Sequence, residues 1–241
     1  MTNSRSSWPQ AMAAWDQTRV QAFRKDLLAW YDKNKRDLPW RKSQDPYAIW
    51  VSEIMLQQTQ VATVIPYYQR FMAALPTVSD LAQAPEETLL NLWQGLGYYS
   101  RVRNMQAAAQ QVMADFGGQM PDQVDSLLSL KGIGPYTAAA IASMAFGRVA
   151  PALDGNLFRI VARLFRLKDD IALPKSRKVF MEILDILIDP DRPGDFNQAM
   201  MDLGACVMTP SNPRPDNHPL ASYDASYQVG DSDQYPVKSK K

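Results

Sequence analysis

The chain has 241 residues, 46% of them hydrophobic and 21% charged, and its formal net charge is +1. A chain of this length buries a core as one or two subdomains. No apolar run approaches the ~20 residues that span a bilayer, so we expect no membrane segment. One Cys and one His exclude a disulfide framework and a zinc cluster. Residues 1–17 lack the apolar block of a secretory signal, and we therefore expect an intracellular, cytoplasmic protein.

Apolar residues recur with a helical period along most of the chain, and no segment alternates in the manner of a strand. The breaks are short and carry Pro, Gly or helix-capping residues. The predicted apolar helical segments are 23–31, 49–57, 61–75, 89–93, 105–116, 157–167, 179–188 and 196–207. The sequence thus predicts an all-α fold of about ten helices. Residues 209–215 are too rich in proline for a helix, and residues 222–241 are predicted to be a tail or linker.

A glycine pair, Gly132 and Gly134, is predicted to form a tight turn between a short helix and a helix that starts at Pro135. The free N–H groups of such a turn, together with the helix dipole, suit a phosphate oxygen. Lys131 lies on the same turn and is expected to meet phosphate. The alternative is an ordinary corner between two helices with glycine caps.

Positive charge gathers around this turn and the helix after it. Residues 117–168 hold six Lys and Arg against three acids, whereas residues 169–241 hold eight against twelve. Arg159, Arg163 and Arg166 are spaced to lie near one helix face. That face either contacts phosphate or is simply solvated.

Two acidic residues occupy contrasting contexts. Glu53 interrupts an apolar helical run, where burial is expected to raise its pKa and keep it protonated. Asp154 precedes a predicted helix, where it would accept backbone N–H bonds and stay ionised. A neutral acid and an anion form a pair suited to breaking a glycosidic bond. The alternatives are a salt-bridged helix residue for Glu53 and a plain helix cap for Asp154.

Five motifs occur in a fixed order: residues 38–41 (LPWR), 52–61 (SEIMLQQTQV), 95–101 (GLGYYSR), 153–156 (LDGN) and 196–204 (FNQAMMDLG). Over residues ~25–208 the chain resembles the MutY family of adenine DNA glycosylases. Their superfamily, the helix-hairpin-helix glycosylases, also includes endonuclease III. The resemblance implies removal of adenine paired with 8-oxoguanine or guanine in double-stranded DNA. It also implies two helical subdomains with the active site in the cleft between them.

The implied glycosylase domain covers residues 16–221. It has a central six-helix part at about 38–150 and a second subdomain formed by the N-terminal helix and about 151–221.

The resemblance also assigns roles to individual residues. Glu53 would protonate the adenine ring, and Asp154 would stabilise the positive charge that develops on the sugar. Asn156 would hydrogen-bond within the site. Tyr136 occupies the position of the Schiff-base lysine in bifunctional relatives, and because a phenol forms no imine, little or no lyase activity is expected. The alternative for Tyr136 is a purely structural hairpin residue.

The remaining assignments concern the base and the duplex. Five residues match positions that line the base pocket of the family: Leu38, Trp40, Arg41, Val61 and Gln198. Extruding a base leaves a gap in the duplex, and Gln58 and Tyr98 match the wedge positions that fill it. We expect one of Tyr98 and Tyr99 to be buried and the other exposed. The full expected DNA-binding set is Gln57, Gln58, Thr59, Tyr98, Arg101, Lys131, Gly132 and Gly134.

The chain departs from the family in two respects. Most relatives hold an iron–sulfur cluster with four cysteines, but the matching positions here are Met208, Pro215, His218 and Asp224. We therefore predict no cluster and no other metal, with residues 209–219 packed in its place and Cys206 buried. Relatives usually carry a C-terminal domain that recognises oxidised guanine. The sequence stops near where that domain would begin, so we expect weaker discrimination between oxidised and normal guanine.

Two other functions stay open at this point. One is a cluster-free mismatch glycosylase for thymine or another base. The other is a helix-hairpin-helix module that binds DNA without catalysis. The adenine glycosylase implied by the resemblance is expected to be a monomer.

Overall fold

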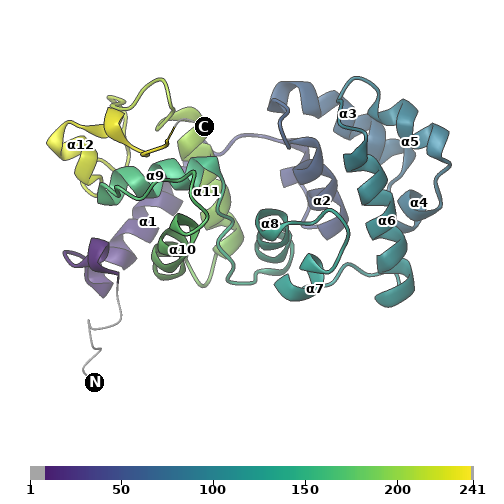
Figure 1. Ribbon diagram of the computed structural model, residues 1–241, viewed down its shortest axis with the longest axis horizontal. Coiled ribbons are helices and arrows are strands. Elements are labelled where there is room, and N and C mark those ends of the chain that lie inside the picture. The colour runs from purple at the N-terminus through teal and green to yellow at the C-terminus, as the bar shows by residue number, and fades with distance from the viewer. Residues whose placement is uncertain (1–8, 240–241) are drawn as a thin grey trace. The chain divides into compact units, whose positions relative to one another are not determined.

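The structure is a computed structural model that describes residues 9–239 (Figure 1). The expected all-α class is confirmed, since these residues form helices and no strand. No helix among them is both long enough and apolar enough to cross a bilayer. The chain divides into two compact units, one formed by residues 37–150 and the other by the flanking segments up to 36 and from 151. The expectation of no secretory signal in residues 1–17 lies partly outside the described residues.

The unit of residues 37–150 contains seven α-helices and one 3-10 helix. They are η3 (Pro39–Arg41), α2 (Pro46–Met55), α3 (Val61–Ala74), α4 (Val78–Gln83), α5 (Glu86–Trp93), α6 (Ser100–Asp115), α7 (Val124–Leu128) and α8 (Pro135–Phe146). Capping residues in the sequence fix where several of these helices begin. Asp45 caps α2 by accepting the N–H of Tyr47, and Thr77 forms a capping box with Asp80 at the start of α4.

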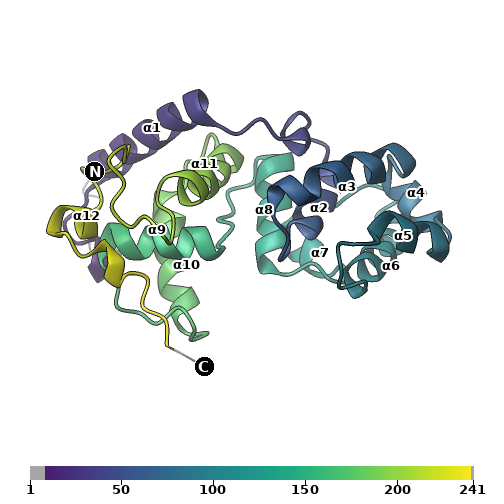
Figure 2. The same ribbon diagram turned by 90° about the horizontal axis from the view of Figure 1, so that it is seen from above.

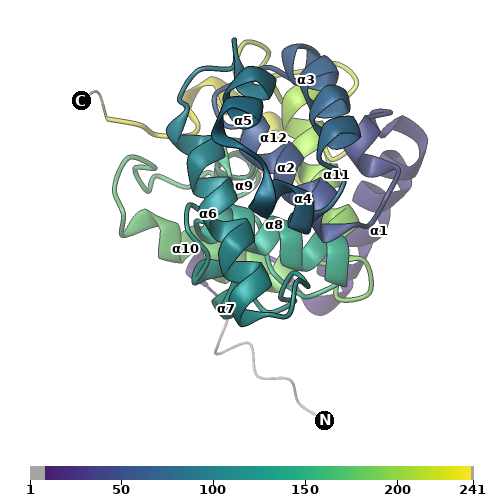
Figure 3. The same ribbon diagram turned by 90° about the vertical axis from the view of Figure 1, so that its right-hand side faces the viewer.

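Helix α2 lies at the centre of this unit. All residues from Tyr47 to Met55 are buried, and α2 packs on α8. Four alanines of α8, Ala138, Ala139, Ala140 and Ala142, are buried as well, and small side chains let two helix backbones approach closely. Figure 3 shows α6 running beside α4 and α5, which it contacts. The result is a rigid frame around α2 and the turn between α7 and α8.

The second unit contains five α-helices and two 3-10 helices. They are η2 (Gln10–Met12), α1 (Gln17–Asn34), α9 (Gly155–Phe165), α10 (Ser176–Leu187), α11 (Pro193–Cys206), α12 (Ala225–Val229) and η4 (Ser232–Gln234). Figure 2 shows α1 lying along α11, and α11 also packs on α9. Phe23, Phe180 and Phe196 are fully buried in this core.

Residues 222–239 differ from the tail or linker that we expected. They form α12 and η4, and α12 packs on α9. Asp224 caps α12, and Ser226 and Ser232 are buried and hydrogen-bonded to each other at 2.9 Å. Polar contacts and the packing of Tyr223 against Trp15 and Phe23 hold this segment. It has no apolar stripe with a helical period, which is why periodicity did not reveal it.

The arginines of α9 explain how the segment is fastened. Arg159 donates to the carbonyl of Met208, and the buried Arg163 donates to the carbonyls of Met208, Thr209 and Tyr235. Arg166 pairs with Asp231 at 2.6 Å. We expected this face to meet phosphate or solvent; instead it binds the C-terminal segment of the same unit.

Candidate active site

Glu53 lies near the C-terminal end of α2 and is 7% exposed. Its neighbours in sequence, Ser52 and Ile54, are buried too, so the carboxyl group sits in an apolar helix. The hydroxyl of Tyr136 donates to Oε2 of Glu53 at 2.7 Å. Burying a carboxyl group is costly unless it is hydrogen-bonded, and this contact supplies a donor.

Tyr136 comes from the first turn of α8, directly after the glycine turn. The contact between Tyr136 and Glu53 therefore ties the start of α8 to the end of α2. The two residues are 83 positions apart in sequence, and only the packing of α2 on α8 brings them together. The hydroxyl of Tyr136 acts here as a hydrogen-bond donor to the candidate acid.

The glycine turn has the geometry expected of a backbone anion site. Gly132 has φ of +79°, and a Cβ on it would come within 2.9 Å of the Cβ of Asn104 on α6. Only glycine fits this turn without strain. Gly132 and Gly134 are exposed, and their N–H groups donate to no acceptor within residues 9–239. Lys131 is exposed beside them, and its own N–H donates to the side chain of Gln111.

Asp154 is the N-cap of α9 in the other unit, and its carboxyl group is half-buried. Oδ1 accepts the N–H of Leu157 at 2.8 Å, and Oδ2 accepts the amide of Asn156 at 2.9 Å. Burial raises the pKa of Asp154 above its usual value, and these hydrogen bonds only partly oppose that effect. The direction differs from the expectation that capping alone would keep Asp154 firmly ionised. The cap forms as expected, but desolvation outweighs it.

Asn156 is oriented by its neighbours. Its Oδ1 accepts from Arg159 at 2.8 Å, which leaves its NH2 group to face Asp154. Arg159 also donates to the carbonyl of Gly204 on α11. A Cβ on Gly204 would approach the Cβ of Asn156 to 2.7 Å, so α11 can lie this close only because residue 204 is glycine.

The residues expected to line a base pocket divide between the two units. Leu38 and Trp40 are buried around η3, Trp40 packing edge-on against Tyr68. Arg41 ends η3, and the half-buried Val61 begins α3. Gln198 belongs to α11 in the other unit, where its Oε1 accepts from the hydroxyl of Tyr31 at 2.5 Å.

The two expected wedge residues stand on strained, exposed tips. Gln58 has φ of +59° and Tyr98 has φ of +47°. The left-handed region costs an ordinary residue about 1–2 kcal/mol, so other contacts must hold these tips. Tyr98 is 65% exposed and Tyr99 is 37% exposed. The expectation that one tyrosine would be buried is wrong, because α6 begins at residue 100 and leaves both rings outside its packed face.

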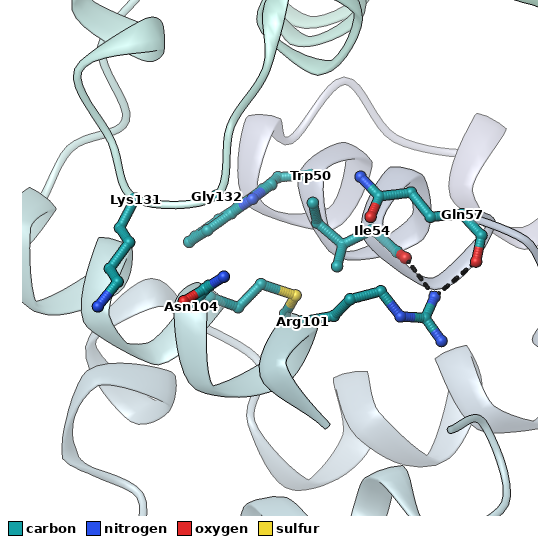
Figure 4. Close-up of a pocket in the computed structure, with 8 residues that line it drawn as sticks. Trp50, Ile54, Gln57, Arg101, Asn104, Lys131 and Gly132 are labelled. Atoms are coloured by element: carbon teal, nitrogen blue, oxygen red, sulfur yellow. Dashed lines mark hydrogen bonds between the residues drawn. The ribbon is translucent and has the colours of Figure 1, made fainter. Parts of the chain in front are cut away.

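Arg101 is placed differently from the other residues of the expected DNA-binding set. Its guanidinium lies half-buried between the two tips and donates to backbone carbonyls, including that of Gln57 at 2.7 Å. Figure 4 shows this side chain beside a pocket of about 60 Å³, with bonds to the carbonyls of Ile54 and Gln57. The pocket is also lined by Trp50, Asn104, Met105, Lys131 and Gly132. Gln57 and Thr59 are half-buried in the same loop, and the hydroxyl of Thr59 donates to the carbonyl of Gln57.

The positions that match the cluster cysteines of most relatives carry a donor set that does not fit an iron–sulfur cluster. Met208 and Pro215 offer no thiolate. His218 Nε2 and Asp224 Oδ2 lie 2.9 Å apart and bind each other, both almost fully buried. Cys206, which we expected to be buried, is exposed on the last turn of α11. No group of three or more metal-binding side chains occurs in residues 9–239.

Two contributors were missed by sequence reasoning. Arg101 donates to carbonyls of two loops, and Arg159 donates to the carbonyl of Gly204 on α11. From the sequence both arginines are possible DNA contacts, but no sequence signal predicts these bonds. The sequence also gave no sign that Tyr136 binds Glu53.

Comparison with known proteins places this geometry in a family. Residues 51–187, more than half of the chain, match the family described as HhH-GPD superfamily base excision DNA repair protein. The chain is 48% identical to the adenine DNA glycosylases of Rattus norvegicus and Homo sapiens over 87% and 86% of its length. It covers 42% and 40% of those two proteins. It is 35% identical to the adenine DNA glycosylase of Buchnera aphidicola subsp. Schizaphis graminum, over 92% of this chain and 64% of that protein.

Solved structures show the same fold. A thermostable thymine-DNA glycosylase superposes with a TM-score of 0.80 at 27% identity, over 89% of this chain and 100% of that chain. A non-covalent endonuclease III–DNA complex superposes with a TM-score of 0.72 at 20% identity, over 90% and 98%. The family match and the shared helical fold lead to one conclusion: this chain belongs to the HhH-GPD superfamily of base excision DNA repair proteins.

Proposed function

We propose that this protein is a monofunctional DNA glycosylase that removes adenine paired with 8-oxoguanine or guanine. The observation that carries the proposal is the buried carboxyl group of Glu53 in the apolar helix α2, hydrogen-bonded to Tyr136 from the helix that follows the glycine turn. A buried acid joined directly to a candidate phosphate-binding turn suits an enzyme that acts on nucleic acid. The 48% identity to adenine DNA glycosylases favours adenine as the base.

In the proposed reaction Glu53 donates its proton to a ring nitrogen of the extruded adenine. The bond between the base and the sugar then breaks, and its electron pair leaves with the base. The carboxylate of Asp154 stabilises the positive charge that forms on the sugar. Water adds to the sugar carbon and gives a proton to the carboxylate of Glu53, which leaves an abasic site and restores the acid. Asn156 holds Oδ2 of Asp154 in place throughout.

The duplex would be held by the backbone and opened by two side chains. The N–H groups of Gly132 and Gly134, with Lys131 beside them, suit a DNA phosphate. Gln58 and Tyr98 would fill the gap that the extruded base leaves. We propose that Leu38, Trp40, Arg41, Val61 and Gln198 line the base pocket.

Three further expectations stay part of this proposal. Tyr136 offers no amine for an imine, so borohydride should trap no covalent complex with DNA.

We propose that no cluster or other cofactor is required, because His218 and Asp224 bind each other. Iron and sulfide analysis tests this, and a stoichiometric brown chromophore would contradict it. We also propose that the protein acts on double-stranded DNA as a monomer.

Removal of thymine is the second candidate. A specific observation favours it, since the thymine-DNA glycosylase structure matches 89% of this chain with a TM-score of 0.80. The identity to that protein is 27%, against 48% to the adenine glycosylases. Adenine therefore remains the first choice.

The experiment is a single-turnover assay with protein in excess over four duplexes. They carry adenine opposite 8-oxoguanine, adenine opposite guanine, thymine opposite guanine, and adenine opposite thymine as the control. We expect release of adenine from the first two and none from the last two. Release of thymine alone would replace the proposal with the second candidate, and tight binding without release of any base would point to a binding module.

A further inference from the structure

Arg101 belongs to the expected DNA-binding set, and its guanidinium donates to five backbone carbonyls of the protein. It belongs to the first turn of α6, and its guanidinium reaches between two loops. Nη1 donates to the carbonyls of Ile54 at 2.9 Å, Met55 at 3.3 Å and Gln57 at 2.7 Å. Nη2 donates to the carbonyls of Leu96 at 3.0 Å and Gly97 at 3.2 Å. One side chain thus binds the residues directly before each of the two tips.

Each of these loops contains one residue whose backbone conformation is unfavourable for a side chain other than glycine. The tip residues Gln58 and Tyr98 are both in the left-handed region without being glycine. Such conformations persist where surrounding contacts over-determine them, and they gather at functional sites. Arg101 binds the carbonyls of Gln57 and Gly97, which lie one residue before Gln58 and Tyr98 respectively.

The guanidinium is itself fixed from several sides. It lies 5.2 Å from the ring centre of Trp93 and 5.8 Å from that of Tyr98. The indole N–H of Trp93 donates to the carbonyl of Gly97 at 3.0 Å, so Trp93 supports only the second loop. The planar guanidinium of an arginine carries several N–H donors and can reach two loops at once, whereas the ammonium group of a lysine acts as a single point charge.

We propose that Arg101 is a positioning residue that fastens the two wedge tips, residues 56–59 and 94–99, into one rigid unit. This inference rests on the proposed function only where it assigns the tips to the duplex. Arg101 itself does not touch the DNA. Its role is to present Gln58 and Tyr98 together, so that both enter the duplex when the base is extruded.

The first test uses the free protein, so it does not depend on activity. Amide hydrogen exchange is followed in wild type and in Arg101→Lys, with Arg103→Lys as the matched control because Arg103 is exposed on the same helix. In Arg101→Lys we expect exchange in residues 56–59 and 94–99 to rise at least tenfold, and to rise in both. Arg103→Lys should exchange as wild type does. A change in only one loop, or in neither, overturns the proposal.

Trp93→Phe separates a shared clamp from general loosening. It removes the donor to Gly97 and should raise exchange only in residues 94–99. If Arg101→Lys does not fold, amide exchange of wild type at low denaturant concentrations tests the proposal instead. Both loops should then open with the same equilibrium constant, because one side chain holds them. Clearly different opening equilibria would overturn the proposal.

The second test asks whether Arg101 acts through the tips. A fluorescent adenine analogue in the duplex reports extrusion, and single-turnover release reports chemistry. Arg101→Lys should slow both by roughly ten- to a hundredfold, as should Gln58→Ala combined with Tyr98→Ala. Adding Arg101→Lys to those two substitutions should change the rate less than threefold. Fully multiplicative losses would overturn the proposal. If wild type releases no base, the proposed function is wrong. The amide exchange data then still test whether Arg101 holds the two loops together.

Discussion

Glu53 and Asp154 hold their carboxyl groups in two different ways. Glu53 lies inside an apolar helix, and the hydroxyl of Tyr136, 83 residues away on another helix, donates to it. Asp154 caps its own helix, and its partners Asn156 and Leu157 lie two and three residues further on. The first group depends on tertiary packing and the second on local capping. Substitutions at the two sites should therefore differ in their effects on activity and on stability.

The largest expected effect is that of Glu53→Gln. The amide keeps the shape of the side chain but cannot deliver a proton, so adenine release should fall by ~10²–10⁴-fold. DNA binding should persist, because no candidate phosphate contact involves Glu53. Single-turnover release and a gel-shift titration on the same duplex measure the two effects. Unchanged release would remove Glu53 from the proposed mechanism.

Asp154→Asn should follow, with a loss of ~10²–10³-fold in release, since the charge that stabilises the sugar is removed. The rate of wild type should fall on acidification as Asp154 takes up a proton. Because burial raises its pKa, this loss should occur above the usual range of an aspartate. A pH–rate profile under single-turnover conditions measures it. An acid limb at or below pH 3.8, the ordinary value, would contradict the assignment.

The stability of Asp154→Asn sharpens the comparison further. A carboxyl group whose pKa is raised by folding favours the folded state at low pH and loses that contribution as pH rises through the folded pKa. At pH 7 the ionised form therefore costs stability. Asparagine removes the charge, and its Oδ1 still accepts the N–H of Leu157, but its NH2 group would face the NH2 group of Asn156. The raised pKa therefore shows in the pH dependence: wild type should gain stability relative to this variant as pH falls from 7 to 4. Urea unfolding at both pH values measures this, and a constant difference between the two proteins would contradict the raised pKa.

Tyr136→Phe should have a smaller effect on activity. It removes the hydroxyl that donates to Glu53 and leaves the ring. That hydrogen bond would stabilise the carboxylate that forms as Glu53 gives up its proton, so its loss should cost about 1.5 kcal/mol, or roughly tenfold in rate. The glycine turn keeps its backbone, so affinity for undamaged duplex should be unchanged. Parallel rate and affinity measurements test this. Equal losses in both would mean that Tyr136 acts by shaping the turn instead.

Asp224→Asn should leave activity least affected and act on the stability of the C-terminal segment. Burial alone would raise the pKa of Asp224, but hydrogen bonds from His218, Tyr227 N–H and Ser226 outweigh it and lower the pKa. This contribution is present above the unfolded pKa of about 4 and is lost as pH falls through the folded value.

The variant should lose about 1–3 kcal/mol of unfolding free energy at pH 7. His218 Nδ1 accepts from Leu220, which assigns the ring proton to Nε2 and leaves an asparagine NH2 facing another donor. Urea unfolding at pH 7 and pH 4 measures the effect, with the exposed Asp233→Asn as control. An equal loss in the control would show that net charge, not the buried pair, is responsible.

Local sequence signals predicted what depends on neighbours in the chain. The helical class, the cap at Asp154, the turn at Gly132 and the apolar setting of Glu53 all follow from residues a few positions apart. Local signals did not predict the structure of residues 222–239, because hydrogen bonds from Arg163 and Arg166, far away in sequence, fix that segment. They also misplaced one of the two tyrosines, Tyr98 and Tyr99, and Cys206, since exposure depends on which helices pack around a residue.

The sequence by itself determined the helices, their breaks and the identity of the two candidate carboxyl groups, because periodicity and capping are properties of short stretches. Only the tertiary structure decided which donor meets Glu53, which way burial moves the pKa of Asp154, and that Arg101 binds two loops. The physical reason is the same in each case. Desolvation and long-range hydrogen bonds depend on groups that the chain brings together only when its helices pack.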